Sequence, residues 1–227
     1  MHPLSAQKVG NALYGLLDLV VGSANLSPPL ESFLGSLLAS AASWIADSLS
    51  SSTTEHVVDL RRRLLMVLPK MPVGLCTAAQ LGQWARVDAA LASALSARKS
   101  SVDSFYGPPE DSSYIESRVY ERVDQWAAKA GATGVRQGDW LLDCFEADVT
   151  FRVPGADPAS GPTTINVEVD GPTHKQPTKK LFCRRRDAVL SAAGVRVVRV
   201  DVDAARDLME KKDGGAAFDT WLDAISC

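Results

Sequence analysis

Several features that would place a protein in a familiar class are absent from this sequence. No apolar run reaches the roughly 18 residues that a helix needs to cross a bilayer, and Asp18 interrupts the apolar stretch at residues 13–21. No basic segment precedes that stretch, so a secretory signal peptide is not indicated. We therefore expect no membrane partner.

Metal-binding and disulfide patterns are also missing. The four cysteines, Cys76, Cys144, Cys183 and Cys227, are far apart, and the Cys-x-x-Cys or Cys/His spacing of a structural zinc site does not occur. Scattered thiols fit a reducing compartment better than a disulfide-stabilised domain. We expect no resident cofactor, with Mg²⁺ required only if the protein is a nuclease.

Basic residues are not in excess. With 24 Lys and Arg against 27 Asp and Glu, the formal net charge is −3. Proteins that bind nucleic acid over much of their surface usually carry a basic excess. The charge balance counts against a general polyanion binder but is compatible with a local basic patch.

Helical patterns fill the first part of the chain. At 227 residues the sequence has room for one large domain or two small ones. Apolar residues recur at helical spacing, and turn residues separate four segments, at 4–21, 30–49, 50–68 and 77–95. We predict an all-α helical-repeat segment over residues 1–98, of the kind found in α-solenoids or bundles.

A change of period indicates a second domain. Residues 99–113 contain Gly107, Pro108 and Pro109 among serines and aspartates, which is typical of a linker. The patterns that follow are a helix, two strands, a helix and a strand, at 114–130, 141–153, 163–170, 178–194 and 195–202. With two short helical stretches at the end, this order predicts an α/β domain over residues 114–227.

Three carboxylates of this domain are candidate catalytic residues and candidate metal ligands. Glu168 and Asp170 are two apart on a predicted strand, so their side chains point to one face. Carboxylates on an apolar strand must be solvated, paired or bound to a cation. Asp148 on the preceding strand would complete an oxygen-rich site that Mg²⁺ accepts. His174, after the turn, is a further catalytic candidate, although a hydrogen-bonded turn residue is the simpler interpretation.

A basic run follows the turn and contains no acid. On a helix Lys180 and Arg184 share one face, as do Lys179 and Arg186. Because acidic residues outnumber basic ones in the chain as a whole, this concentration indicates a phosphate-contacting face, although a solvated helix face is the alternative. The candidate RNA-binding residues are Lys175, Lys179, Lys180, Arg184, Arg185 and Arg186.

The segments FEADVTF, INVEVDGPTH and RRRDAVLSAAGVRVVRVD together resemble the RAP domain, an RNA-binding module common in organellar proteins. The resemblance extends over roughly residues 112–203 and includes the helix that leads into the strands. The matching positions are Asp148, Glu168, Asp170, Gly171, Pro172, His174, Arg186, Asp187, Leu190, Gly194, Val197 and Val198.

This resemblance implies a restriction-endonuclease-like fold for the C-terminal domain and RNA as the partner. Upstream, Gln7, Asn11, Leu13 and Leu16 are similar to the octotricopeptide-like helical repeats that often precede RAP domains. The implied location is a mitochondrion, or alternatively a plastid. The implied roles are RNA maturation, translation or a place in a ribonucleoprotein such as the mitochondrial ribosome, with ribosomal RNA and ribosomal proteins as partners.

Two alternatives stay open. One is a Mg²⁺-dependent endonuclease that uses Asp148, Glu168 and Asp170, although the usual Asp…Glu-x-Lys motif has a lysine where this chain has Asp170. The other is a protein-interaction scaffold whose helical part docks partners. We expect RNA binding without catalysis.

Overall fold

The computed structural model describes residues 52–67, 78–97, 114–155, 161–210 and 215–226, with isolated positions between 15 and 49. The chain divides into two compact units, Met1–Tyr106 and Gly107–Cys227. The division falls within residues 99–113, which are themselves outside the described part. The helix predicted at 4–21, with its repeat-like positions, also lies outside the described residues, apart from Gly15.

In the N-terminal unit, two helices pack against each other, α3 (Thr54–Val67) and α4 (Ala78–Ala97). Their bounds agree with the two segments predicted there to within a few residues. Trp84, Leu91 and Leu95 of α4 are buried, and Arg61 of α3 pairs with Asp88 of α4 at 3.2 Å. None of the helices in the described ranges has both the length and the apolarity that a bilayer crossing requires.

The C-terminal unit is an α/β domain, as predicted. Its elements, in chain order, are α6 (Tyr114–Ala130), β1 (Thr133–Leu141), β2 (Phe145–Val153), β3 (Thr163–Asp170), η4 (Pro172–Lys175), α7 (Pro177–Ala192), β4 (Val195–Asp201), α8 (Val202–Glu210) and α9 (Ala216–Ser226). The sheet has the order β1-β2-β3-β4. The first two pairings are antiparallel, whereas β3 and β4 are parallel and are joined by α7.

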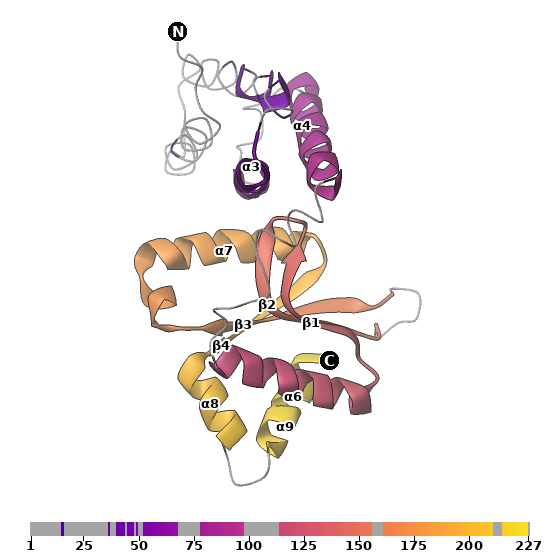
Figure 1. Ribbon diagram of the computed structural model, residues 1–227, viewed down its shortest axis with the longest axis vertical. Coiled ribbons are helices and arrows are strands. Elements are labelled where there is room, and N and C mark those ends of the chain that lie inside the picture. The colour runs from indigo at the N-terminus through magenta and orange to yellow at the C-terminus, as the bar shows by residue number, and fades with distance from the viewer. Residues whose placement is uncertain are drawn as a thin grey trace. The chain divides into compact units, whose positions relative to one another are not determined.

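The helices cover the sheet unequally: α6, α8 and α9 lie on one face and α7 on the other (Figure 1). Alternate residues of the central strands point into the first layer, where Val149, Phe151 and Val167 pack against α6, α8 and α9. Trp126 of α6 meets Phe151 edge-on at 5.5 Å between ring centroids. The apolar core therefore lies between this face and the three helices.

The other residues of the same strands face α7, and several are polar. Thr150, Asn166 and Glu168 are all buried. A buried carboxylate must be paired or hydrogen-bonded, so this layer is where the charged residues singled out in the sequence meet their partners.

One strand was not predicted, and the bounds of another were wrong. The sequence Thr133–Leu141 forms β1, at one end of the sheet, although Gly134 and Gly138 interrupt it with positive φ values of 64° and 63°. The strand predicted from residue 141 begins only at Phe145. Leu142 and Asp143 form a turn in which both residues have positive φ, a conformation that a propensity argument does not anticipate for leucine.

Candidate nucleic-acid interface

The turn after β3 and the start of α7 position the basic run. The chain leaves β3 at Asp170, makes the short helix η4 and enters α7 at Pro177. Proline fits the first helical position, because its missing N–H has no intrahelical partner there. Gly194, at a φ of 81°, ends the helix and allows β4 to begin at Val195.

Two of the three consecutive arginines of α7 point inward. Arg185 is 3% exposed and Arg186 is 7% exposed. Arg186 Nη2 lies 2.6 Å from Glu168 Oε2, and its Nη1 donates to the Glu146 carbonyl oxygen at 3.3 Å. Asn166 Nδ2 donates to the other Glu168 oxygen at 2.7 Å. This arrangement fixes α7 to the sheet.

The burial of these arginines corrects the expectation that Arg184, Arg185 and Arg186 all meet phosphates. Successive residues on an α-helix differ by about 100° in direction, so three in a row cannot share one face. Only Arg184 is exposed. Lys179 and Arg186, seven residues apart, lie on nearly the same side of the helix, but Lys179 is exposed and Arg186 is buried, so the expectation that they form one phosphate-contacting face is wrong.

Asp170 lies in a second charged network. Its Oδ1 is 2.9 Å from His174 Nδ1 and forms an ion pair with Arg199 of β4. Arg199 also donates to both oxygens of Asp187 on α7, at 2.8 and 3.1 Å. Burial by itself lowers the pKa of Arg199. The hydrogen bonds from Arg199 to Asp187 and the negative charges of Asp187 and Asp170 outweigh this effect, so the pKa of Arg199 is raised overall. His174 is therefore near Asp170, as expected.

Asp148 replaces a main-chain acceptor at the end of the β2–β3 ladder. Its Oδ2 accepts the Val169 N–H at 2.7 Å. Burial, and then the charge of the Glu168 carboxylate, raise the pKa of Asp148 to about 7. Because this pKa is raised in the folded state, its favourable contribution to stability is complete below about pH 4 and is lost as the pH rises through about 7.

The three candidate metal ligands are engaged separately. Glu168 pairs with Arg186, Asp170 pairs with Arg199, and Asp148 accepts a backbone N–H. Within the described ranges, no three His, Cys, Asp or Glu side chains form a group that could hold a metal ion. The oxygen-rich site expected from the sequence is therefore not assembled in this conformation.

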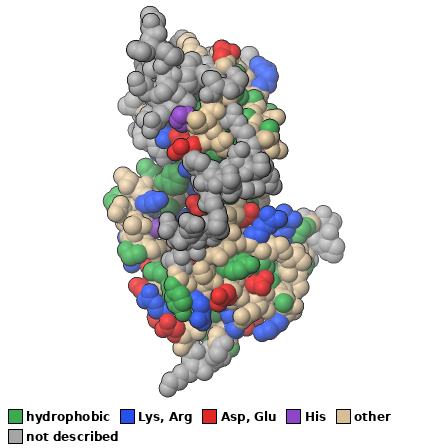
Figure 2. All heavy atoms as spheres, viewed as in Figure 1, with side chains coloured by type: hydrophobic (Ala, Val, Ile, Leu, Met, Phe, Trp, Pro, Cys, Tyr) green, Lys and Arg blue, Asp and Glu red, His purple; other side chains and the backbone are tan. Residues whose placement is uncertain are grey.

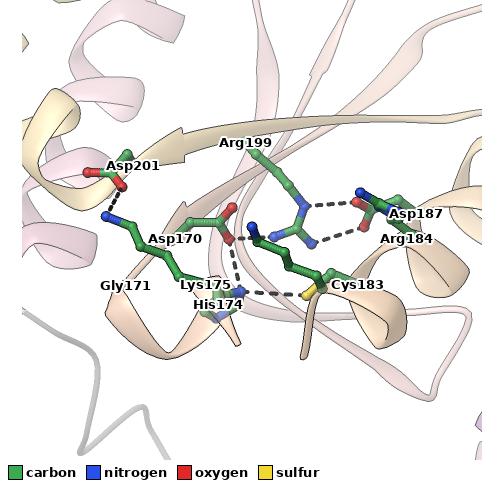
Figure 3. A pocket seen from close by; sticks show the side chains of 10 residues that line it. Asp170, Gly171, His174, Lys175, Cys183, Arg184, Asp187, Arg199 and Asp201 are labelled. Carbon is green, nitrogen blue, oxygen red and sulfur yellow. Dashed lines mark hydrogen bonds and ion pairs between the residues drawn. The ribbon is translucent and has the colours of Figure 1, made fainter. Parts of the chain in front are cut away.

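A cavity of about 330 Å³ opens beside Asp170, between η4, α7 and the end of β4, and we call it the charged pocket. Figure 3 shows Lys175 reaching Asp201, His174 between Asp170 and Cys183, and Arg199 between Asp170 and Asp187. The Lys175–Asp201 distance is 3.2 Å. The Asp203 backbone N–H and then Lys175 lower the pKa of Asp201.

Lys180 and Arg184 also line the charged pocket and have exposed side chains. They are four residues apart on one face of α7, as predicted. Neither is in an ion pair with any described residue. Like charges at this spacing destabilise a helix by about 0.2–0.5 kcal/mol, so an anion bound between them would relieve their repulsion.

Sequence reasoning did not assign Arg199, Asp187, Asp201 or Cys183 to the site. Arg199 is the parallel register partner of Glu168, and Asp201 is that of Asp170. The parallel β3–β4 pairing brings the carboxyl ends of both strands to one sheet edge. The strand–helix–strand order of the sequence predicts this parallel pairing, and it could have identified Arg199 and Asp201 as residues near the site.

Charge is mixed on the face of the C-terminal unit that Figure 2 shows. On the face seen in Figure 2, acidic and basic side chains are interspersed on its surface rather than separated by sign. This agrees with the small net charge of −3.

Comparison with protein-family models, curated proteins and solved structures finds no match to this chain.

Proposed function

We propose that this chain binds RNA through η4 and the first turns of α7, as a component of an organellar ribonucleoprotein. The observation that carries the proposal is the pair Lys180 and Arg184, which are exposed and in no ion pair with any residue the structure describes. Lys175 and Lys179 are exposed in the same stretch. Phosphate oxygens are the usual partners of such cations in protein–nucleic acid complexes.

The architecture of the C-terminal unit supports this proposal. A leading helix, three antiparallel strands, a crossover helix and a parallel fourth strand are compatible with a RAP domain of restriction-endonuclease-like fold. The Glu-x-Asp-Gly-Pro-x-His segment, which carries much of the resemblance, forms the end of β3 and the turn η4, beside the charged pocket.

The charge distribution supports a stable ribonucleoprotein component rather than a freely diffusing RNA searcher. A searcher benefits from a basic field over the whole molecule, whereas this chain has a net charge of −3. A bound subunit needs only one basic face and presents its acidic surface to protein neighbours. By resemblance we place it in a mitochondrion, or alternatively a plastid, with the mitochondrial ribosome as one candidate assembly.

The test is the salt dependence of RNA binding by the full chain. For single-stranded RNA, log K falls with log salt by about 0.7 for each phosphate contact, so three contacts, from Lys179, Lys180 and Arg184, predict a slope of about −2, since Lys175 is paired with Asp201. Fluorescence anisotropy with an unstructured RNA measures it. Lys180→Ala and Arg184→Ala should each reduce the slope by about 0.7.

Arg196→Ala is the matched control for this titration. Arg196 is exposed on β4, and it precedes Asp201 by five residues, on the order of 16 Å along a strand. The control should leave the slope unchanged. The proposal is wrong if the chain binds no RNA, or if the Lys180 and Arg184 variants keep the full slope. Assembly with protein partners that resists both salt and ribonuclease would favour the scaffold instead.

A metal-dependent endonuclease is the second candidate, and one observation favours it. The Asp148 and Glu168 carboxylates are close enough for the charge of one to raise the pKa of the other, and a divalent cation would relieve that repulsion. When bound, Mg²⁺ would supply an activated water and stabilise developing phosphate charge. The Arg186–Glu168 ion pair must open first, which makes this candidate the weaker one.

Incubating structured RNA with the chain and Mg²⁺, and then with EDTA, separates the two functions. Asp148→Asn is the informative variant, because an amide oxygen still accepts the Val169 N–H. Metal-dependent cleavage by the wild type that is absent in this variant would establish the nuclease. Binding without cleavage in both would support the non-catalytic proposal.

A further inference from the structure

The charged pocket contains more positive charge than its own carboxylates neutralise. Each of its three aspartates has a basic partner: Arg199 serves both Asp170 and Asp187, and Lys175 serves Asp201. Lys180 and Arg184 are left over, with no carboxylate against them in the described ranges. Four Lys and Arg charges therefore stand against three aspartate charges in the pocket, and the two cations without an ion-pair partner in the described ranges lie on one face of α7.

The two unpaired cations favour a ligand that presents several anionic oxygens close together. An internal phosphodiester carries one negative charge, whereas a phosphomonoester carries about 1.5 to 2 at neutral pH. Arg184 can bind such a group through two parallel N–H donors, and Lys180 adds a point charge from the same helix face. A phosphomonoester presents three unesterified oxygens, enough for both Arg184 donors and for Lys180, whereas an internal diester presents two.

The size of the pocket agrees with a single terminal group. Its volume, about 330 Å³, is that of a small-molecule site. A surface that follows a continuous strand is instead a groove spanning roughly 4 to 16 nucleotides. We infer that the charged pocket holds the phosphate at an end of an RNA strand, with Lys180 and Arg184 as its ligands. This inference rests on the proposed RNA binding.

The experiment compares one short single-stranded RNA in three forms: with a 5′-phosphate, with a 3′-phosphate, and with hydroxyls at both ends. The full chain is titrated into each form at fixed salt. One of the phosphorylated forms should bind about tenfold more tightly than the hydroxyl form. That preference should disappear in Arg184→Ala and in Lys180→Ala, and it should persist in Arg196→Ala.

Arg184→Lys separates positioning from charge, because lysine keeps the charge but lacks the paired donors. It should retain only part of the preference. Circular dichroism checks that the variants fold, and Lys180 and Arg184 are exposed, so their replacement should leave the fold intact.

The outcomes distinguish this inference from the proposed function. Equal binding of all three RNAs, with the salt slope still dependent on Lys180 and Arg184, overturns the terminal-phosphate site and leaves RNA binding in place. Binding of a nucleoside monophosphate but of no RNA overturns both the RNA-end ligand and the proposed function. A phosphate preference that survives both alanine variants overturns the assignment of Lys180 and Arg184 as ligands.

Discussion

The Arg186–Glu168 ion pair provides a quantitative test of how α7 is held on the sheet. Both residues are buried, with their charged atoms 2.6 Å apart. Replacing Arg186 by methionine keeps an unbranched chain but leaves Glu168 with Asn166 as its remaining hydrogen-bond donor in the network described above. Removing one partner of a buried pair destabilises a protein by about 3–5 kcal/mol. Arg186→Met should therefore lower the free energy of unfolding by about that amount.

Adding Glu168→Gln to Arg186→Met should restore part of this loss, because a neutral amide leaves no uncompensated charge in the interior. The double variant should be more stable than Arg186→Met alone. Arg184→Met is the matched control: its side chain is exposed and in no ion pair within the described ranges. It should change stability by less than about 0.5 kcal/mol.

Native-state hydrogen exchange of the β3 amides is the appropriate assay, since it reports the stability of the C-terminal unit alone. Two results would refute the reasoning. One is an Arg186→Met protein whose free energy of unfolding is within about 1 kcal/mol of the wild-type value, because a broken buried pair should cost well more than that. The other is a double variant whose loss equals the sum of the two single losses, which would show that the residues are not coupled.

Two further predictions concern Asp148 and the positive-φ glycines. Relative to the wild type, Asp148→Asn should gain stability as the pH rises from about 4 to 8, by on the order of 4 kcal/mol, because burial and Glu168 raise the pKa of Asp148 to about 7. Urea unfolding at several pH values measures this difference. Asp124→Asn is the control, because the Asp124 side chain is exposed on the outer side of α6, and a pH-independent difference would contradict the prediction. Gly215→Ala should destabilise the protein more than Gly194→Ala. Both glycines have positive φ, and placing alanine in that conformation costs about 1–2 kcal/mol at each position. Only at Gly215 would the added Cβ also lie 2.9 Å from Arg122 Cζ. Thermal unfolding compares them, and equal losses would show that this contact is relieved without strain.

Periodicity was sufficient to predict α3, α4, α6 and α7 and the central strands. It failed for β1 because residues 133–141 include two glycines and several polar side chains. Such a segment has little intrinsic strand preference. Its pairing with β2 creates the strand, and that pairing is a tertiary contact outside any local window.

The sequence predicted which residues of the site would lie close together, but not which of them would form ion pairs with one another. Residue order placed Asp170, His174 and the basic run close together, because they are adjacent in the chain. Which arginine faces outward depends on how α7 rotates against the sheet, and this follows from the buried Arg186–Glu168 pair. The role of Arg199 required the parallel β3–β4 register, which joins residues distant in sequence.

We propose that RNA contacts the outward-facing cations of η4 and α7, and photo-crosslinking tests this most directly. The full chain is irradiated with RNA containing 4-thiouridine, and mass spectrometry locates the adducts. Adducts should concentrate on the stretch from Lys175 to Arg184 and should decrease in a Lys180→Glu/Arg184→Glu variant. Adducts found only elsewhere in the chain, or unchanged in that variant, would contradict the claim.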